Sequence, residues 1–286
     1  MDYKTILVHV DDSVHCAARA GAAAAIAQRC NAHVIGAALS GVSRFLYQTM
    51  PIEANDPTLA LHLEFLRERG RDALALFARQ MERAGVASHE GMLVDDEAGA
   101  GISLHARAAD LVVVGQAEQG HAAPPLLADF PAYVVIHSGR PVLLLPFGMQ
   151  ACDPGRHVLV SWDASREAAR ALQLALPLLA RAESVTVAVF DTRGANRTVA
   201  DATAADPVPF LARHGIGAEL SIVPVEQKRG HRRHDVGEAL LMLADERSSD
   251  LLVMGAYGHS RFRETILGGA TRTVLEGMTI PVLMAH

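Results

Sequence analysis

Asp110-Leu111-Val112-Val113-Val114-Gly115 returns later in the chain as Asp250-Leu251-Leu252-Val253-Met254-Gly255, at an offset of 250 − 110 = 140 residues. Pro141-Val142-Leu143-Leu144 returns at the same offset as Pro281-Val282-Leu283-Met284. Two separate matches that share one offset indicate an internal repeat. The chain has 286 residues, and a domain typically has about 100–200, so the length also agrees with two related domains.

The two copies match at their first strands as well, but at another offset. Ile6-Leu7-Val8-His9-Val10-Asp11 resembles Val158-Leu159-Val160-Ser161-Trp162-Asp163, which gives 163 − 11 = 152. The change from 152 to 140 predicts 12 extra residues in the first copy, between its first and fourth strands, and we expect them within Gly41–Thr58. The domains are expected at 1–147 and 157–286, with Phe147–Arg156 as the linker.

Short apolar runs alternate with longer amphipathic segments in each copy. Runs such as Leu111–Val114 are apolar without alternation, which is typical of central parallel strands covered on both faces. Helical spacing of Ala and Leu predicts helices in Arg71–Arg83 and Ser165–Arg181, and Ser13 and Ser165 are the expected N-caps. This alternation predicts an α/β fold with doubly wound sheets and right-handed crossovers. The expected strands are 4–9, 32–39, 86–93, 111–115 and 142–146, then 157–161, 184–190, 217–225, 250–255 and 280–285.

The composition is that of a globular protein, with 50% hydrophobic and 20% charged residues. A net charge of −6 argues against nucleic-acid binding, which needs a basic face. Cys16, Cys30 and Cys152 have no C-x-x-C spacing, so we expect neither a disulfide framework nor a cysteine zinc site, as in a reducing cytoplasm. We find no signal-peptide pattern and no run of about 18 apolar residues, so no membrane association is expected.

A glycine-rich loop follows the fourth strand of the second copy. Gly255-Ala256-Tyr257-Gly258 is followed, after nine residues, by Gly268-Gly269-Ala270-Thr271 at the start of a predicted helix. Glycine permits tight turns with positive φ, and N–H groups at a helix start with no Cβ in the way form an anion site. Ligands of open α/β sheets bind beyond the carboxyl ends of the strands. The spacing therefore predicts a phosphate site, whereas any one pair of these glycines would indicate only a turn.

The spacing Gly255-x2-Gly258-x9-Gly268 resembles the nucleotide loop in the ATP-binding branch of the universal stress protein family, and the whole chain resembles a tandem-domain member. The resemblance implies a Rossmann-like fold in each copy, with a five-stranded parallel sheet in the order 3-2-1-4-5. It also implies that Asp163 lies against the adenosine and that Val225 lines the adenine pocket. The other implied nucleotide-binding residues are Met254, Gly255, Gly258, Gly268, Gly269, Ala270 and Thr271.

Many ATP-binding members have Ser or Thr where this chain has Gly269, so the backbone contact is kept and a side-chain hydroxyl has to come from Thr271. Asp163 has two interpretations from the residues alone: it accepts a hydrogen bond from the ligand, or it caps the following helix together with Ser165. The family resemblance favours the ligand.

The first copy has lost the loop. Asp11 and Gly115 remain, but Gly115-Gln116-Ala117-Glu118-Gln119-Gly120 has the wrong spacing. Leu126-Leu127-Ala128-Asp129-Phe130-Pro131 stands where the paired glycines would be, and Asp129 and Phe130 would repel and block a phosphate. We predict that the first copy does not bind ATP as the family does.

Other motifs are weak or absent. His231 and His234 form an H-x-x-H pair, but a solvated loop explains them better and no third metal ligand is evident. A Walker loop, G-x-x-x-x-G-K-[ST], and a nucleophile elbow, G-x-S-x-G, do not occur. We therefore predict no metal site and no catalytic residues.

The leading hypothesis is a cytoplasmic stress-response protein that binds ATP or another adenine nucleotide in its second domain, with or without Mg²⁺ and with little or no turnover. The alternatives are a slow ATPase or phosphotransfer enzyme and a nucleotide-free protein-interaction module. Bare apolar strand edges favour pairing, so we expect strand 142–145 to face strand 282–284 in an intramolecular pseudo-dimer, as in tandem members of the family. A homodimer of two chains is a further expectation.

Overall fold

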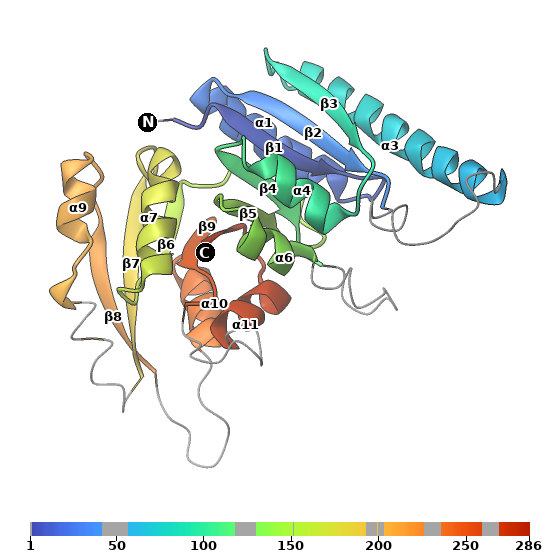
Figure 1. Cartoon of the computed structure of the whole chain (residues 1–286). Helices are drawn as coiled ribbons and strands as arrows, with labels where there is room; N and C mark the ends of the chain where they lie inside the picture. The colour runs from blue at the N-terminus through green and yellow to red at the C-terminus, as the bar shows by residue number, and fades with distance from the viewer. Residues whose placement is uncertain are drawn as a thin grey trace.

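Ten strands form one continuous sheet in the computed structural model, in the order β3-β2-β1-β4-β5-β10-β9-β6-β7-β8 (Figure 1). The structure describes residues 2–41, 57–117, 130–150, 152–192, 199, 203–225, 236–258 and 269–286. The strands of the first copy are β1 Thr5–Val10, β2 His33–Leu39, β3 His89–Val94, β4 Leu111–Gly115 and β5 Val142–Leu145. Those of the second copy are β6 His157–Ser161, β7 Ser184–Thr192, β8 Glu219–Val225, β9 Leu251–Gly255 and β10 Val282–Ala285.

Each copy contributes five parallel strands in the order 3-2-1-4-5, as the resemblance implied. The second copy repeats the arrangement with β8, β7, β6, β9 and β10. The copies join where β5 and β10 pair antiparallel, with Leu283 opposite Leu143. The expected contact between these two strands is therefore confirmed.

Because β5 and β10 are antiparallel, all strands of one copy run opposite to those of the other. The carboxyl ends of β1 and β4 lie at one edge of the sheet, and those of β6 and β9 lie at the opposite edge. Ligand sites of such sheets lie beyond carboxyl ends, so the candidate sites of the two copies are on opposite edges.

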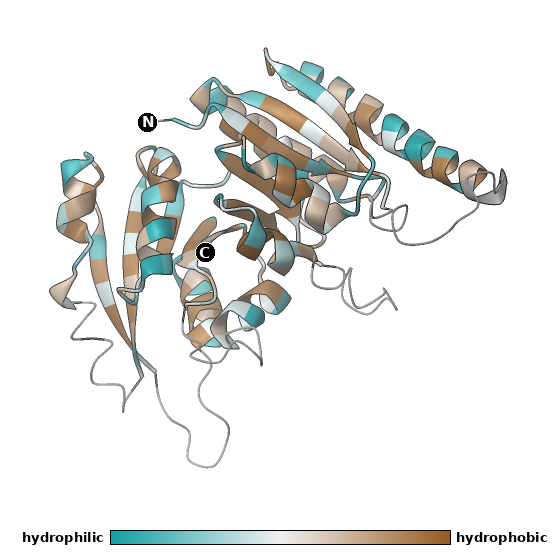
Figure 2. Cartoon of the chain, in the orientation of Figure 1, coloured by the Kyte–Doolittle hydropathy of each residue, from teal (hydrophilic) through white to brown (hydrophobic). Residues whose placement is uncertain are grey.

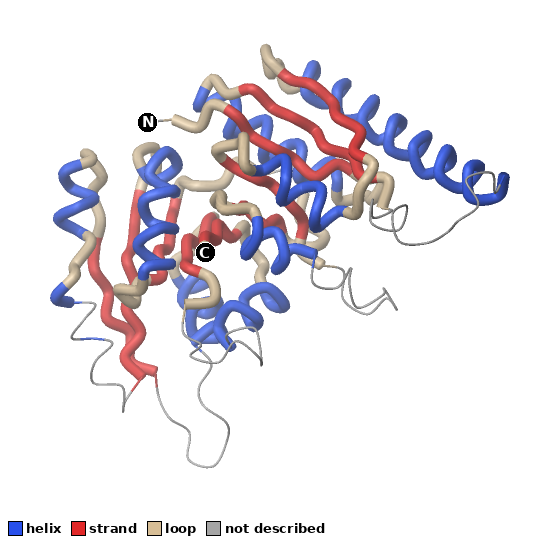
Figure 3. The backbone as a smooth tube through the Cα atoms, in the orientation of Figure 1, coloured by secondary structure: helices blue, strands red, loops and turns tan. Residues whose placement is uncertain are grey.

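Helices cover both faces of the sheet (Figure 3). Residues of α1, α3, α7 and α9 pack in one core cluster, and residues of α4, α6, α10 and α11 pack in the other. The central strands β1, β4 and β5 are among the most hydrophobic parts of the chain, which agrees with burial on both faces (Figure 2). No helix among the described residues is long and apolar enough to cross a membrane. The helices are α1 Cys16–Cys30, α3 Pro57–Arg83, α4 Ala98–Ala106, α6 Phe130–His137, α7 Arg166–Leu179, α9 Val208–Arg213, α10 Val236–Glu246 and α11 Gly269–Gly277.

The two expected N-caps have different outcomes. Ser165 caps α7, because its Oγ accepts a hydrogen bond from Ala168 N at 3.1 Å. The prediction for Ser13 is wrong: α1 begins at Cys16, and His15 precedes it without a side-chain cap. The physical reason is the carboxylate of Asp11, whose Oδ1 accepts hydrogen bonds from both the N and the Oγ of Ser13.

The extra residues of the first copy lie between β2 and β3. The link from β2 to β3 (40–88) is longer than the link from β7 to β8 (193–218), and it contains the 27-residue α3, whereas α9 has 6 residues. Most of the predicted insertion Gly41–Thr58 lies outside the described residues. The link from β8 to β9 (226–250) is in turn longer than that from β3 to β4 (95–110). The 12 residues inferred from the offsets are thus a net difference between two length changes.

Candidate functional site

The chain turns sharply after β6, at the carboxyl edge of the second copy. Asp163 Oδ1 accepts a hydrogen bond from Ser165 N at 2.9 Å, and Ala164 between them has a positive φ of 59°. Since Ser165 itself caps α7, Asp163 supports the capping residue and is not the cap. A positive φ costs energy for residues other than glycine, and such strained residues are concentrated at functional sites.

The glycine that ends β9 is required by close packing against α7. A Cβ built at Gly255 would lie 2.5 Å from Ala168 N, so no other residue permits this approach. A Cβ at Gly258 would lie 2.8 Å from Glu167 Oε2, which shows that the Glu167 carboxylate lies directly against this segment. The first part of the predicted loop is therefore packed on the first turn of α7, and that turn carries a negative charge.

The second part of the predicted loop begins α11. Gly269 is the first residue of this helix, and a Cβ built there meets no described atom within 4 Å. Thr271 is 4% exposed, and its Oγ1 accepts a hydrogen bond from Tyr257 N at 3.4 Å. Tyr257 has a φ of 64°. The Thr271 hydroxyl thus fastens the strained segment after β9 to the start of α11.

The other residues predicted to bind the nucleotide are not brought as close to Asp163 and the start of α11. Met254 is 5% exposed and packs in the core cluster with residues of α10 and α11. Val225 ends β8, which β7 separates from β6, and its backbone pairs with Thr192. Gly268 lies outside the described residues, as do His231 and His234. The structure therefore brings Asp163, Gly255, Gly258, Gly269, Ala270 and Thr271 to one edge of the sheet on β6, β9, α7 and α11.

The first copy repeats one part of this arrangement and lacks another. Asp11 Oδ1 accepts from Ser13 N at 3.0 Å, as Asp163 does from Ser165. The counterparts of Ala164 and Tyr257, which are Asp12 (164 − 152) and Ala117 (257 − 140), have no positive φ. At these two positions of the repeat, only the second copy has backbone with positive φ.

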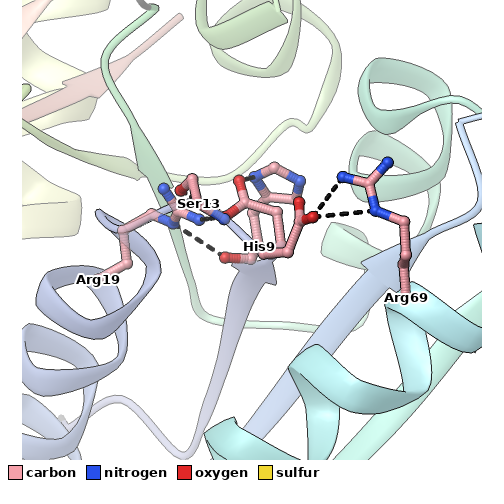
Figure 4. Close-up of polar contacts among 6 residues, drawn as sticks. His9, Ser13, Arg19 and Arg69 are labelled. Atoms are coloured by element: carbon pink, nitrogen blue, oxygen red, sulfur yellow. Dashed lines mark hydrogen bonds and ion pairs between the residues drawn. The ribbon is translucent and has the colours of Figure 1, made fainter.

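An arginine takes the space beside the surviving glycine of the first copy. A Cβ on Gly115 would lie 3.0 Å from Nη1 of Arg19, which is buried. Arg19 donates from Nη2 to Asp11 Oδ1 at 2.5 Å and from Nε to His9 O at 3.0 Å (Figure 4). Its counterpart in the second copy is Ala171 (19 + 152). Sequence reasoning missed Arg19; its signal is a charged residue inside the alanine-rich stretch 17–27 of the helix.

At the carboxyl ends of β1 and β4, the ionisable side chains of His9 and Asp11 lie close to Arg19. Burial, reinforced by the positive charge of Arg19, lowers the pKa of His9 to about 4. Burial alone would raise the pKa of Asp11, but the charges of Arg19 and His9 and the hydrogen bonds from Ser13 and Arg19 outweigh it and hold that pKa below its usual range. Phe130 begins α6, and its ring centroid lies 4.8 Å from that of His9, while Asp129 is outside the described residues.

Comparison with known proteins agrees with the repeat. The model of the universal stress protein family matches residues 2–146 and 155–286. A universal stress protein of Synechocystis sp. is 31% identical over 146 residues, which is 50% of this chain and 46% of that protein. The alignment thus spans just under half the length of the curated relative.

Two solved structures match nearly the whole chain. A universal stress protein from Archaeoglobus fulgidus has a TM-score of 0.73 at 17% identity, covering 98% of this chain and 97% of that one. A functionally unknown protein from Pseudomonas aeruginosa PAO1 has a TM-score of 0.60 at 15% identity, covering 99% and 92%. These structures share the fold, and the family model covers both copies. The chain belongs to the universal stress protein family, with two domains of that family in tandem.

Proposed function

We propose that the second domain binds an adenine nucleotide, ATP or a close relative, and that the protein is a cytoplasmic stress-response nucleotide-binding protein with little or no turnover. One observation carries the proposal. The start of α11 and the strained segment after β9 lie together at the carboxyl edge of the second copy, joined by the hydrogen bond from Tyr257 N to Thr271 Oγ1.

The start of α11 suits a phosphate. The first N–H groups of a helix have no partner within it, and the helix dipole favours an anion there. Gly269 leaves space where a side chain would otherwise stand. In this proposal the base and ribose lie toward Asp163 and Val225, and the phosphates lie toward α11. The proposed contact residues are Asp163, Val225, Met254, Gly255, Gly258, Gly268, Gly269, Ala270 and Thr271.

Low turnover is proposed because the described residues place no lysine at this edge, and the arginines there, Arg166 and Arg272, form ion pairs with Glu167 and Glu276. Rapid phosphoryl transfer relies on cations around the transferred group. The only lysine among the described residues is Lys4, whose Nζ donates to Cys30 O in the first copy. Glu167 adds a negative charge next to Gly258. Mg²⁺ bound with the nucleotide would offset that charge.

Equilibrium dialysis of the whole chain against ATP tests the proposal. The protein should take up ATP at millimolar concentration or below, and Gly269→Val should remove this uptake by placing a branched side chain at the helix start. Gly217→Val is the matched control, because a Cβ there also meets no described atom within 4 Å but lies near the start of β8, at the opposite edge. Absence of uptake by folded protein contradicts the proposal and favours the nucleotide-free module. Equal uptake by the two variants contradicts the proposed site at the start of α11.

A further inference from the structure

The first copy contains a small cavity at the carboxyl edge of β1 and β4. Its volume is about 190 Å³, and its walls include His9, Asp11, Arg19, Phe130, Pro146 and Phe147. Sites for drug-sized ligands have roughly 300–1,000 Å³, so this cavity suits a molecule of one ring and a few substituents. It lies at the opposite edge of the sheet from the proposed nucleotide site.

Among the described residues, the cavity wall offers no uncompensated positive charge. Arg19 is bound to Asp11 Oδ1 and to His9 O, so its charge is already paired. His9 is neutral at pH 7 because its pKa is lowered to about 4. Beside the cavity, Arg69 of α3 is paired with Asp12 (Figure 4). An anionic ligand would therefore lose hydration without gaining a partner of opposite charge.

One carboxylate oxygen in the wall accepts no hydrogen bond from a residue that the structure describes. Asp11 Oδ1 accepts from Ser13 N, Ser13 Oγ and Arg19 Nη2. Asp11 Oδ2 has only His9 Nδ1 nearby, at 3.8 Å, which is beyond hydrogen-bond distance, and no other described residue donates to it. A half-buried ionised oxygen gains most from a ligand N–H or O–H group.

Aromatic side chains form the apolar part of the wall. The ring of Phe147 lies 4.0 Å from the ring of His15, and the ring of Phe130 lies 4.8 Å from that of His9. Phe147 is 47% exposed, although it lies at the cavity. Tilted aromatic rings at these distances present faces and edges on which a further ring can pack.

We propose that this cavity is a second ligand site, which takes a small uncharged aromatic molecule that carries an N–H or O–H donor. The donor bonds to Asp11 Oδ2, and the ring packs against Phe130 and Phe147. The site is separate from the proposed nucleotide site, and it does not depend on nucleotide binding.

Saturation-transfer NMR of the whole chain with three probes of similar size tests this site. Phenol carries a donor and no charge at pH 7, methoxybenzene lacks the donor, and benzoate is an anion. Phenol should bind roughly ten-fold more tightly than methoxybenzene, the usual effect of a hydrogen bond to a charged group. Benzoate should give no signal. Equal binding of phenol and methoxybenzene, or tighter binding of benzoate, overturns the proposal.

Three variants locate the phenol. Phe147→Ala should weaken phenol binding several-fold, whereas Leu76→Ala, which shortens an exposed apolar side chain on α3, should leave it unchanged. Both side chains are exposed, so folding should be kept, and circular dichroism checks it. Gly269→Val should bind phenol as the parent does. Unchanged phenol binding in Phe147→Ala, or its loss in Gly269→Val, overturns the proposal.

Discussion

At the scale of single residues, the two copies differ because the same glycine has different neighbours. Gly255 lies against the backbone of α7, which begins at Arg166. Gly115 lies against the Arg19 side chain. The helix α1 begins at Cys16, which corresponds to position 168 at the offset of 152, two positions after the start of α7. One arginine in place of an alanine therefore binds Asp11 and takes the space beside the glycine.

Glu167 should limit nucleotide affinity. Its carboxylate lies at the segment that carries Gly258, so it repels phosphate charge. Glu167→Gln should tighten ATP binding by about three- to ten-fold. This gain in affinity should be smaller at high salt, because salt already screens the repulsion between the Glu167 carboxylate and the phosphates. Isothermal titration calorimetry measures the change. Glu183→Gln, at the amino end of β7, is the control and should leave the affinity unchanged. Equal affinities of the parent and Glu167→Gln would contradict this role.

His9 should make the stability of the protein depend on pH. The pKa of His9 is about 4 in the folded chain and about 6.5 when unfolded, so the unfolded chain binds the proton first as the pH falls. The free energy of unfolding should therefore decrease between pH 6.5 and 4, by up to about 3 kcal/mol from this residue. Urea unfolding at several pH values should give a shallower dependence for His9→Gln than for the parent. A control, His33→Gln on β2, should keep the dependence of the parent; identical dependence in His9→Gln would refute the assignment.

At the scale of elements, α11 connects the two domains. Its start belongs to the proposed nucleotide site, and its end contacts Gln116, which follows β4 in the first copy. Gln116 Nε2 donates to Leu275 O at 2.8 Å and Glu276 O at 3.1 Å, and its Oε1 accepts from Phe147 N. The geometry follows from the antiparallel pair, because the amino end of β10 lies beside the carboxyl end of β5. A nine-residue helix, about 13 Å long, separates the two edges.

Loss of the Gln116 side chain should loosen the end of α11. Gln116→Ala removes three hydrogen bonds, two of which satisfy terminal carbonyls of the helix, at a cost of about 1–3 kcal/mol. Hydrogen exchange measured by mass spectrometry should become faster in peptides that cover 269–277. Gln80→Ala is the matched control, since the Gln80 amide bonds to Ala17 O within the first copy and should not affect α11. Exchange of α11 that stays unchanged in Gln116→Ala would disprove the connection.

The strands could be predicted because long apolar runs report burial on both faces, whereas their order 3-2-1-4-5 was implied by the family resemblance and not by the runs. All ten expected strands occur within a few residues of their predicted positions. The N-cap at Ser13 failed because a carboxylate two residues earlier captured the hydroxyl. Arg19 and Gln116 could not be assigned, since their partners come from other elements and, for Gln116, from a helix of the other domain. Tertiary contacts of polar side chains leave no periodic pattern in the sequence.

At the scale of the whole molecule, the pairing of β5 with β10 places the two candidate sites on opposite edges of one sheet. The same pairing also covers β5 and β10, the two apolar strands that the sequence offered for association. The outermost strands of the sheet are β3 and β8, so the homodimer expected from the sequence would have to use these strands or a helical surface. Sedimentation as a 30.5 kDa particle would exclude that homodimer, whereas a particle of twice this mass would support it.

The asymmetry between the two domains should appear as a difference in nucleotide binding. Native mass spectrometry of the whole chain with ATP measures this difference, because it counts the nucleotides bound to each chain. We expect a complex with one ATP per chain, lost in Gly269→Val and kept in Gly217→Val. Two ATP molecules per chain, or one that persists in Gly269→Val, would refute nucleotide binding by the second domain alone.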